Sequence, residues 1–184
     1  IDHTDRQFVT ALPLPGGNGS EINQRLGNIG SSTATGLELD VEYAATEALS
    51  LTFSLGLIDA DFDEVISYLP DGTATDISDT YNITNTPDTT ANFAVSYEIE
   101  SSLGNFVVNG NYYYRSDYVL SPTDLLVTQD GYGLLNFGVN WYSEDGDWTA
   151  ALQWKNVTDE EYKIGNYGFV AEDDNGGYLP GTGG

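Results

Sequence analysis

Regular alternation between apolar and polar side chains constrains the fold of this chain more than any other feature. Between Trp148 and Lys155, the even-numbered side chains are apolar, whereas the other set includes Thr149 and Gln153. A period of two is that of a β-strand, whose successive side chains point to opposite faces. The same period recurs along most of the chain. The sequence therefore predicts an all-β protein.

Seven strands can be assigned from this pattern. They are expected over residues 5–13, 36–44, 49–57, 93–99, 105–114, 135–141 and 148–155. Short connections at 45–48, 100–104 and 143–147 leave room only for antiparallel pairing of neighbouring strands. The predicted fold is an antiparallel up-and-down meander of about seven strands. The other connections, 13–35, 60–87 and 115–131, are long and are predicted to be irregular loops.

The alternation also predicts which side chains share a face of the sheet. The apolar face should carry Leu37, Leu39, Leu51, Phe53, Leu55, Phe93, Val95, Phe106, Val108, Phe137, Val139, Leu152 and Trp154. The polar face should carry Glu38, Asp40, Glu42, Asn109, Asn111, Asn136, Asn140 and Gln153. A soluble sandwich of two sheets alternates as well, so alternation alone leaves that fold open. However, packing this polar face on a second sheet would bury carboxylates, which favours a water-filled lumen.

Tyr and Trp gather near the predicted strand ends, where the aromatic girdles of membrane barrels lie. Short turns on one side and long connections on the other are also typical of outer-membrane barrels. No apolar run of about 18 residues predicts a transmembrane helix. The pattern therefore indicates part of a large transmembrane β-barrel.

Composition excludes several functions. The 184 residues include 29 acidic but only 5 basic ones, and the net charge of −24 argues against nucleic-acid binding. There is no Cys, and His3 is the only histidine, so no Cys nucleophile or Ser-His-Asp set can be assembled. We expect no catalytic residue and no enzymatic activity. The chain also lacks Met and a signal-peptide core at Ile1, and it looks like a fragment or a processed product.

Two segments carry a family resemblance. The run from Asn156 through Asp159 to Tyr162 resembles the N-L-x-D-x-x-Y signature near the C-terminus of TonB-dependent outer-membrane receptors. The segment 28–38, which contains Gly36 and Glu38, is similar to the N-x-G-x-x-x-x-x-G-x-E strand entry of that family. Segments 85–87, 112–116 and 131–136 also fit.

The resemblance implies a single barrel segment over 1–184, corresponding to the C-terminal third of a receptor barrel. Such a barrel has 22 strands, encloses an N-terminal plug that couples to TonB, and imports siderophores, cobalamin, haem or saccharides. The implied partners are outer-membrane lipid, the rest of the barrel, the plug and, through the plug, TonB. The implied location is the outer membrane of a Gram-negative bacterium. The plug and the last strand are absent from this chain.

Two acidic clusters are candidate cation sites. Asp59, Asp61 and Asp63 lie on one side of an extended chain, and oxygen ligands at this density suit Ca²⁺. The alternative is that these aspartates are simply exposed to solvent where the chain leaves the strand. The segment 172–175, which begins at Glu172, is read as a solvated loop. No other cofactor is expected, and the substrate-binding residues stay unassigned.

A structural role is the alternative to transport. Seven strands without closure leave two sheet edges with unpaired N–H and C=O groups, which cannot face lipid and in water template pairing with another chain. An isolated chain is therefore expected to self-associate through bare edges and apolar faces, and such material would form extracellular β-rich filaments.

Overall fold

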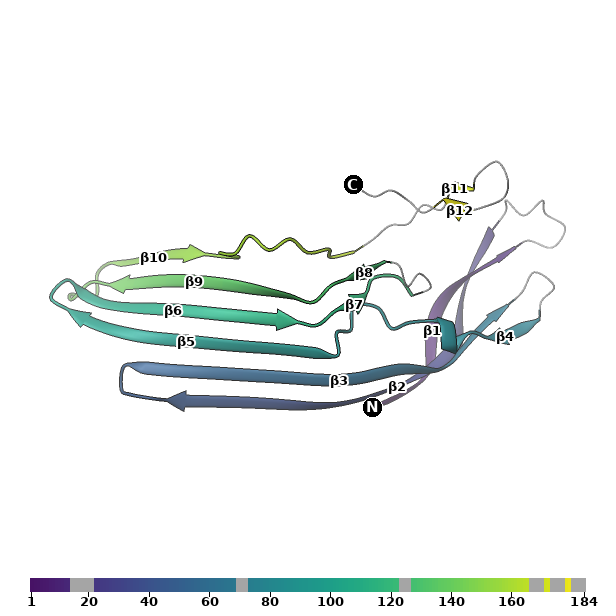
Figure 1. Cartoon of the computed structure of the whole chain (residues 1–184), viewed down its shortest axis with the longest axis horizontal. Coiled ribbons are helices and arrows are strands. Elements are labelled where there is room, and N and C mark those ends of the chain that lie inside the picture. Colours follow the sequence, from purple (N-terminus) through teal and green to yellow (C-terminus); the bar gives the residue numbers. More distant parts are fainter. Residues whose placement is uncertain (14–21, 69–72, 123–126, 166–170, 173–177, 180–184) are drawn as a thin grey trace.

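A single antiparallel sheet dominates the computed structural model, which describes residues 1–13, 22–68, 73–122, 127–165, 171–172 and 178–179. The strand order is β1-β2-β3-β5-β6-β9-β10, so that each strand follows its predecessor across the sheet (Figure 1). The described residues contain no α-helix and one short 3₁₀ helix, η1 (Ser78–Thr80). The predicted all-β meander of about seven strands is confirmed.

Long strands build the sheet, and short strands decorate one end of it. The long strands are β1 (Asp2–Pro13), β2 (Ile22–Ala44), β3 (Leu49–Tyr68), β5 (Thr89–Ser101), β6 (Gly104–Arg115), β9 (Tyr132–Tyr142) and β10 (Thr149–Trp154). The short ones are β4 (Ala74–Asp76), which pairs with β3, and the pairs β7 (Tyr118–Val119) with β8 (Thr128–Gln129) and β11 (Ala171–Glu172) with β12 (Tyr178–Leu179).

The turns β2–β3, β5–β6 and β9–β10 all lie at one end of the sheet, at the left of Figure 1, which we call the tight-turn end. They correspond to the three predicted short connections. In the β5–β6 turn, Ser101 pairs with Gly104, which has a φ of 112°. Glycine is favoured there because residues with a side chain rarely adopt a positive φ. The opposite end, the long-loop end, carries β4, η1, β7 and β8.

The predicted long loops are largely wrong. Residues 22–35 belong to β2, which pairs with both β1 and β3. β3 continues to Tyr68 and pairs with β4, and the connection 115–131 contains β7 and β8. These extensions have little apolar alternation, yet neighbouring strands supply the ladder hydrogen bonds that their backbones need. Backbone hydrogen bonds to a neighbouring strand thus extend β2 and β3 beyond the segments with alternating side chains.

The assignment of side chains to the two faces is confirmed. Directly opposite residues of an antiparallel pair lie on the same face, so the register can be followed across the sheet. The apolar face is continuous through the pairs Leu39↔Leu55, Phe53↔Phe93, Val95↔Gly110, Val108↔Val139 and Val139↔Leu152. The polar face is continuous through Asp40↔Ser54, Ser54↔Asn92, Ala94↔Asn111, Asn111↔Asn136 and Gly138↔Gln153.

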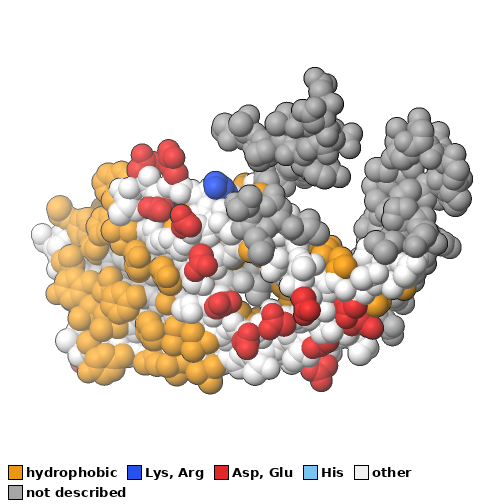
Figure 2. All heavy atoms as spheres, turned by 45° about the vertical axis from the view of Figure 1, so that its right-hand side comes forward, with side chains coloured by type: hydrophobic (Ala, Val, Ile, Leu, Met, Phe, Trp, Pro, Cys, Tyr) orange, Lys and Arg blue, Asp and Glu red, His pale blue; other side chains and the backbone are white. Residues whose placement is uncertain are grey.

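No described segment covers the apolar face. Leu37 and Leu152 keep 60% and 55% of their surface exposed, and an apolar expanse covers the sheet next to the tight turns (Figure 2). The buried apolar cluster among the described residues is small and lies at the long-loop end, around Tyr118, Leu120 and Tyr132. Soluble monomers rarely expose contiguous apolar patches larger than a few hundred Å². The sheet is therefore one layer whose apolar face lacks a protein partner here.

Gly36 permits close approach between β2 and β3. A Cβ atom at this position would lie 2.6 Å from the carbonyl oxygen of Leu57, a backbone atom that cannot turn away. By contrast, a Cβ at Gly138 would meet its nearest atom, the carbonyl oxygen of Leu152, at 3.6 Å, an ordinary contact.

We expect Gly36→Ala to lower the free energy of unfolding by about 1–3 kcal/mol, the usual cost of overpacking. The matched control, Gly138→Ala, should change it by less than about 1 kcal/mol, because the added methyl group fits. Urea titration of the protein refolded in detergent micelles measures both changes. Equal stability of the two variants would contradict the close approach.

Candidate functional site

The apolar face forms a band with borders at both ends. β5, β6 and β9 contain 13, 12 and 11 residues, which meets or slightly exceeds the roughly 9–11 that a tilted strand needs to cross a bilayer core. Tyr97 and Trp141 lie on this face near the tight turns, and the indole nitrogen of Trp141 donates to the carbonyl of Leu103 at 2.8 Å. An amphipathic aromatic ring with a polar contact suits a membrane interface.

The other border of the band is acidic. Leu57 lies on the apolar face of β3. Because side chains alternate, Asp59 and Asp61 lie on the same face, two and four residues further from the tight-turn end. Acidic side chains lie beyond the apolar expanse in Figure 2. On β3 the apolar band therefore ends between Leu57 and Asp59. Its extent along the strands suits the hydrocarbon layer of a membrane.

The predicted calcium residues lie in β3 and not in a loop. The register shift between Ser31 and Ser32 leaves Asp63 as the extra residue of β3, and its Oδ2 accepts a hydrogen bond from the Thr33 hydroxyl at 3.0 Å. In the part of the chain that the structure describes, no three His, Cys, Asp or Glu side chains are grouped closely enough to hold a metal ion. Calcium binding by Asp59, Asp61 and Asp63 stays a prediction.

The other residues singled out from the sequence either lie in strands or fall outside the residues that the structure describes. Glu38 is exposed on the polar face opposite Gly56, and Gly36 lies opposite Ile58. His3 is exposed in β1, where its partner is Ser32. Of the segment 172–175, only Glu172 is within the described residues, in β11.

The motif 156–162 forms a closed turn after β10. Asn156 and Asp159 have φ angles of 51° and 53°, in the left-handed region that Asn and Asp tolerate better than most residues. The Asn156 side chain closes the turn, because its Nδ2 donates to the carbonyl of Glu160 and its Oδ1 accepts from the amide of Glu160, each at 2.9 Å. The motif therefore specifies a backbone shape.

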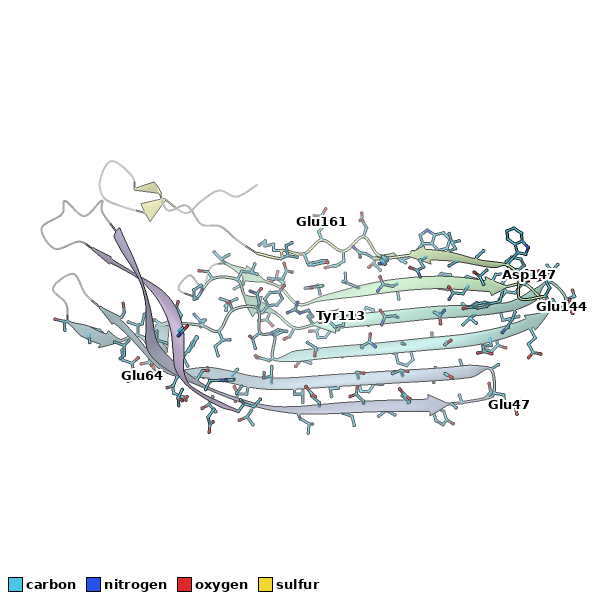
Figure 3. The ribbon with its side chains drawn as sticks, turned by 180° about the vertical axis from the view of Figure 1, so that it is seen from behind. Glu47, Glu64, Tyr113, Glu144, Asp147 and Glu161 are labelled. Carbon is cyan, nitrogen blue, oxygen red and sulfur yellow. The ribbon has the colours of Figure 1, made fainter. Side chains whose placement is uncertain are left out.

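After this turn the chain returns to the side of β9. The Tyr162 ring stacks on Tyr132, with centroids 4.5 Å apart and planes 8° apart, and the Lys163 amide donates to the Gln129 side chain at 2.6 Å. Figure 3 shows Glu161 on this segment, beside the sheet. The tyrosine at the end of the motif anchors the returning chain. Sequence analysis recognised the motif but not these roles.

A ladder of four asparagines crosses the polar face and reaches the motif turn. Asn111 donates to Asn92, Asn136 donates to Asn111 at 3.0 Å, and the Asn156 amide donates to Asn136 at 2.9 Å. We call Asn92, Asn111, Asn136 and Asn156 the asparagine ladder. It ties β5, β6 and β9 to the turn after β10. Asn92 and the ladder itself were missed from sequence, because the contacts depend on strand register.

A cavity of about 510 Å³ opens at the long-loop end. β3 contributes Ala60 and Phe62, which share the parity of the polar face, and the other walls come from segments 78–88 and 117–119 and from Thr128. The Phe62 and Tyr81 rings meet edge to face, with centroids 5.5 Å apart. The cavity thus lies where the β3–β5 connection and the β6–β9 connection meet over β3.

Backbone hydrogen bonds fix the walls of this cavity. The Asn82 amide donates to the carbonyl of Pro122 at 2.8 Å, and the Asn85 amide donates to the carbonyl of Val119 at 3.0 Å. Below η1, the Asp76 carboxylate accepts from the amides of Ser78 and Val65, and these bonds hold its pKa below the ordinary value. The two connections are therefore held together and to β3.

The tyrosines of the cavity remain uncharged near neutral pH. Burial raises the pKa of Tyr81. The pKa of Tyr118 is also raised, mainly by burial and to a smaller extent by the neighbouring Tyr132. Both hydroxyls therefore stay protonated, and the charge of the cavity wall comes from its aspartates.

Comparison with known proteins places the fold. The family model described as "TonB dependent receptor-like, beta-barrel" matches residues 1–157. The ferric yersiniabactin uptake receptor of Yersinia pestis superposes with a TM-score of 0.66 at 18% identity, covering 79% of this chain and 21% of that receptor. The ferric preacinetobactin receptor of Acinetobacter baumannii superposes with a TM-score of 0.59 at 14% identity, covering 96% and 24%.

The chain thus spans less than a quarter of the length of either receptor. No curated protein matches its sequence. Within the described residues, no helix has both the length and the apolar character needed to span a membrane.

We expect Asn156→Ala to lower the free energy of unfolding by about 2–5 kcal/mol. The variant loses two hydrogen bonds of about 0.5–1.5 kcal/mol each and forces alanine into a positive φ at about 1–2 kcal/mol. Asn156→Gly relieves the φ cost but not the lost bonds, so it should fall between wild type and Asn156→Ala.

Hydrogen exchange at the Glu160 and Lys163 amides, together with urea titration, measures these effects. Lys155→Ala, next to the turn, is the control and should leave both amides protected. Loss of protection in the control but not in Asn156→Ala would contradict the role of Asn156.

Proposed function

This chain belongs to the TonB-dependent receptor-like β-barrel family, and we propose that it forms part of the wall of an outer-membrane transporter that takes up its ligand actively. The observation that carries this proposal is the two-faced single sheet. Its apolar face is exposed, whereas most side chains on its opposite face are polar. A sheet of this kind is stable when lipid covers one face and water the other.

Closure of the sheet belongs to the same proposal. β10 has a partner on only one side, and so do residues 35–44 of β2, among the residues that the structure describes. Within lipid every backbone polar group needs a protein partner, so further strands of the barrel would pair with both edges. The location that follows is the outer membrane of a Gram-negative bacterium.

The ligand and the remaining partners follow from the family. The two receptors compared above are named for the uptake of ferric yersiniabactin and for ferric preacinetobactin, and we propose that the cargo here is a siderophore, cobalamin, haem or a saccharide. A plug inside the barrel and TonB acting through the plug would drive uptake. The polar face, which carries Tyr113, Asn111 and Asn136, would line the lumen. The proposal assigns no catalysed reaction to the chain.

The two faces can be told apart by a charged substitution at adjacent positions of β3. Phe53→Arg places a cation on the apolar face near mid-band, where it costs about 2–4 kcal/mol in a bilayer. Ser54→Arg, one residue away, places the same side chain on the polar face and should cost less than about 1 kcal/mol. Measurements are the yield of the complete barrel in outer-membrane fractions and its urea stability in vesicles. Equal losses in the two variants would rule out a lipid-facing apolar face.

A second candidate function is supported by the same bare edges. We propose that the 184-residue chain, when isolated from the rest of a barrel, assembles into β-rich extracellular filaments through its edges and apolar face. Unpaired strand edges template pairing, and apolar burial yields about 25 cal/mol per Å². The net charge of −24 opposes assembly, but screening acts within about 10 Å at 0.1 M salt.

The isolated chain should therefore sediment as large species without detergent, and more so with added salt or Ca²⁺. Analytical ultracentrifugation across a salt series measures this, and fibre diffraction would show the roughly 4.7 Å strand spacing. A folded monomer at moderate salt would exclude the filament role and leave the transporter proposal untouched.

A further inference from the structure

The long-loop end carries a cavity that is open to solvent on one side. Its volume of about 510 Å³ falls within the range of small-molecule sites, roughly 300–1,000 Å³. Its walls are fixed by backbone hydrogen bonds between connections that are distant in sequence. A cavity with fixed walls can select a ligand by shape and charge.

Three carboxylates give this cavity its charge. Asp79, Asp88 and Asp117 line it, and no Lys, Arg or His is found among its described lining residues. Asp88 and Asp117 belong to the connections on either side of the β5–β6 hairpin, whereas Asp79 is in η1. Asp61 also borders the cavity, but strand alternation directs its side chain to the face opposite Ala60 and Phe62.

Two cations near the cavity are bound elsewhere. The Arg115 guanidinium donates to the carbonyl of Asn85 at 3.3 Å and lies 4.6 Å from the centre of the Tyr118 ring. The Lys163 ammonium lies 3.5 Å from the carbonyl of Thr128. No ion pair joins either cation to the three aspartates within the described ranges. The lining itself therefore carries net negative charge, which disfavours an anionic ligand.

The spacing of the three aspartates indicates whether a metal ion or an organic cation would fit the cavity. The described residues include no group of three acidic side chains close enough to hold a metal ion, so the three carboxylates are dispersed around the cavity. A bare ion cannot contact dispersed carboxylates together, and it is much smaller than the cavity. A molecule with several separated positive charges can. The Phe62–Tyr81 pair adds aromatic surface, to which organic cations are attracted.

We propose that this cavity binds an amine-bearing organic cation, as the cargo or a cationic part of the cargo of the transporter. This inference rests on the proposed transport function and narrows its ligand class. Ammonium groups donate charge-assisted hydrogen bonds to Asp79, Asp88 and Asp117, and the aliphatic chain between them contacts Phe62 and Tyr81. Ligands with net negative charge are excluded by the same carboxylates.

Isothermal titration of the complete detergent-folded barrel tests the proposal, with spermidine as the probe. We expect saturable binding that weakens as NaCl rises, because salt screens charge pairs. The triple variant Asp79→Asn, Asp88→Asn, Asp117→Asn should weaken binding at least tenfold. Asp61→Asn is the matched control, since it borders the cavity with its side chain on the other face, and it should bind within twofold of wild type.

Maltotriose, citrate and Ca²⁺ serve as comparison ligands. The inference is overturned if spermidine shows no saturation at millimolar concentration, if the uncharged sugar or the anion binds as tightly, or if Ca²⁺ displaces spermidine at equal concentration. It is also overturned if the triple variant binds like wild type. The salt series uses unmodified protein, so it decides even where a variant folds poorly.

The membrane assay separates this inference from the transport proposal. A barrel that reaches the outer membrane but does not bind spermidine overturns the ligand class alone. A chain that fails to enter the membrane as a barrel overturns the transport proposal itself.

Discussion

Backbone hydrogen bonding between neighbouring strands is the interaction on which the rest of this structure depends. The described residues bury few apolar side chains, so the usual packed core contributes little to the sheet. This backbone ladder instead fixes the register of β2 through β10, and the register decides which side chains share the apolar face and which share the polar face. In a bilayer the ladder is also obligatory, because an unpaired N–H or C=O group has no water to bond.

The polar face carries three different kinds of surface as a result. Toward β9 and β10, amide side chains bond one another and hold the motif turn, so this region is ordered by its own contacts. On β2, Glu38, Asp40 and Glu42 project as exposed carboxylates from the same face. At the long-loop end, the connections gather over β3 and line a cavity. A ligand entering from that end would meet the cavity before the rest of the face.

Much of the fold could be predicted from sequence, because a period of two is a local property of side-chain order. The alternation puts Phe53, Phe93 and Val139 on one face and Asn111 and Asn136 on the other without knowledge of the register, and the structure has both sets where the alternation puts them. The extension of β2 back to Ile22 was missed because its sequence lacks an apolar set. In that region the strand is defined by its partners β1 and β3, which local patterning cannot reveal.

The period of two, the short turns, the acidic charge and the motif from Asn156 to Tyr162 can all be read from the chain, since each is a matter of composition or of neighbouring residues. The bonds of Asn92, Asn111 and Asn136 across strands, and the cavity that Asp79, Asp88 and Asp117 share, appear only in the folded sheet. Such contacts join residues far apart in the chain. They depend on the register between strands and on how the connections fold back, and both are set by the whole sheet.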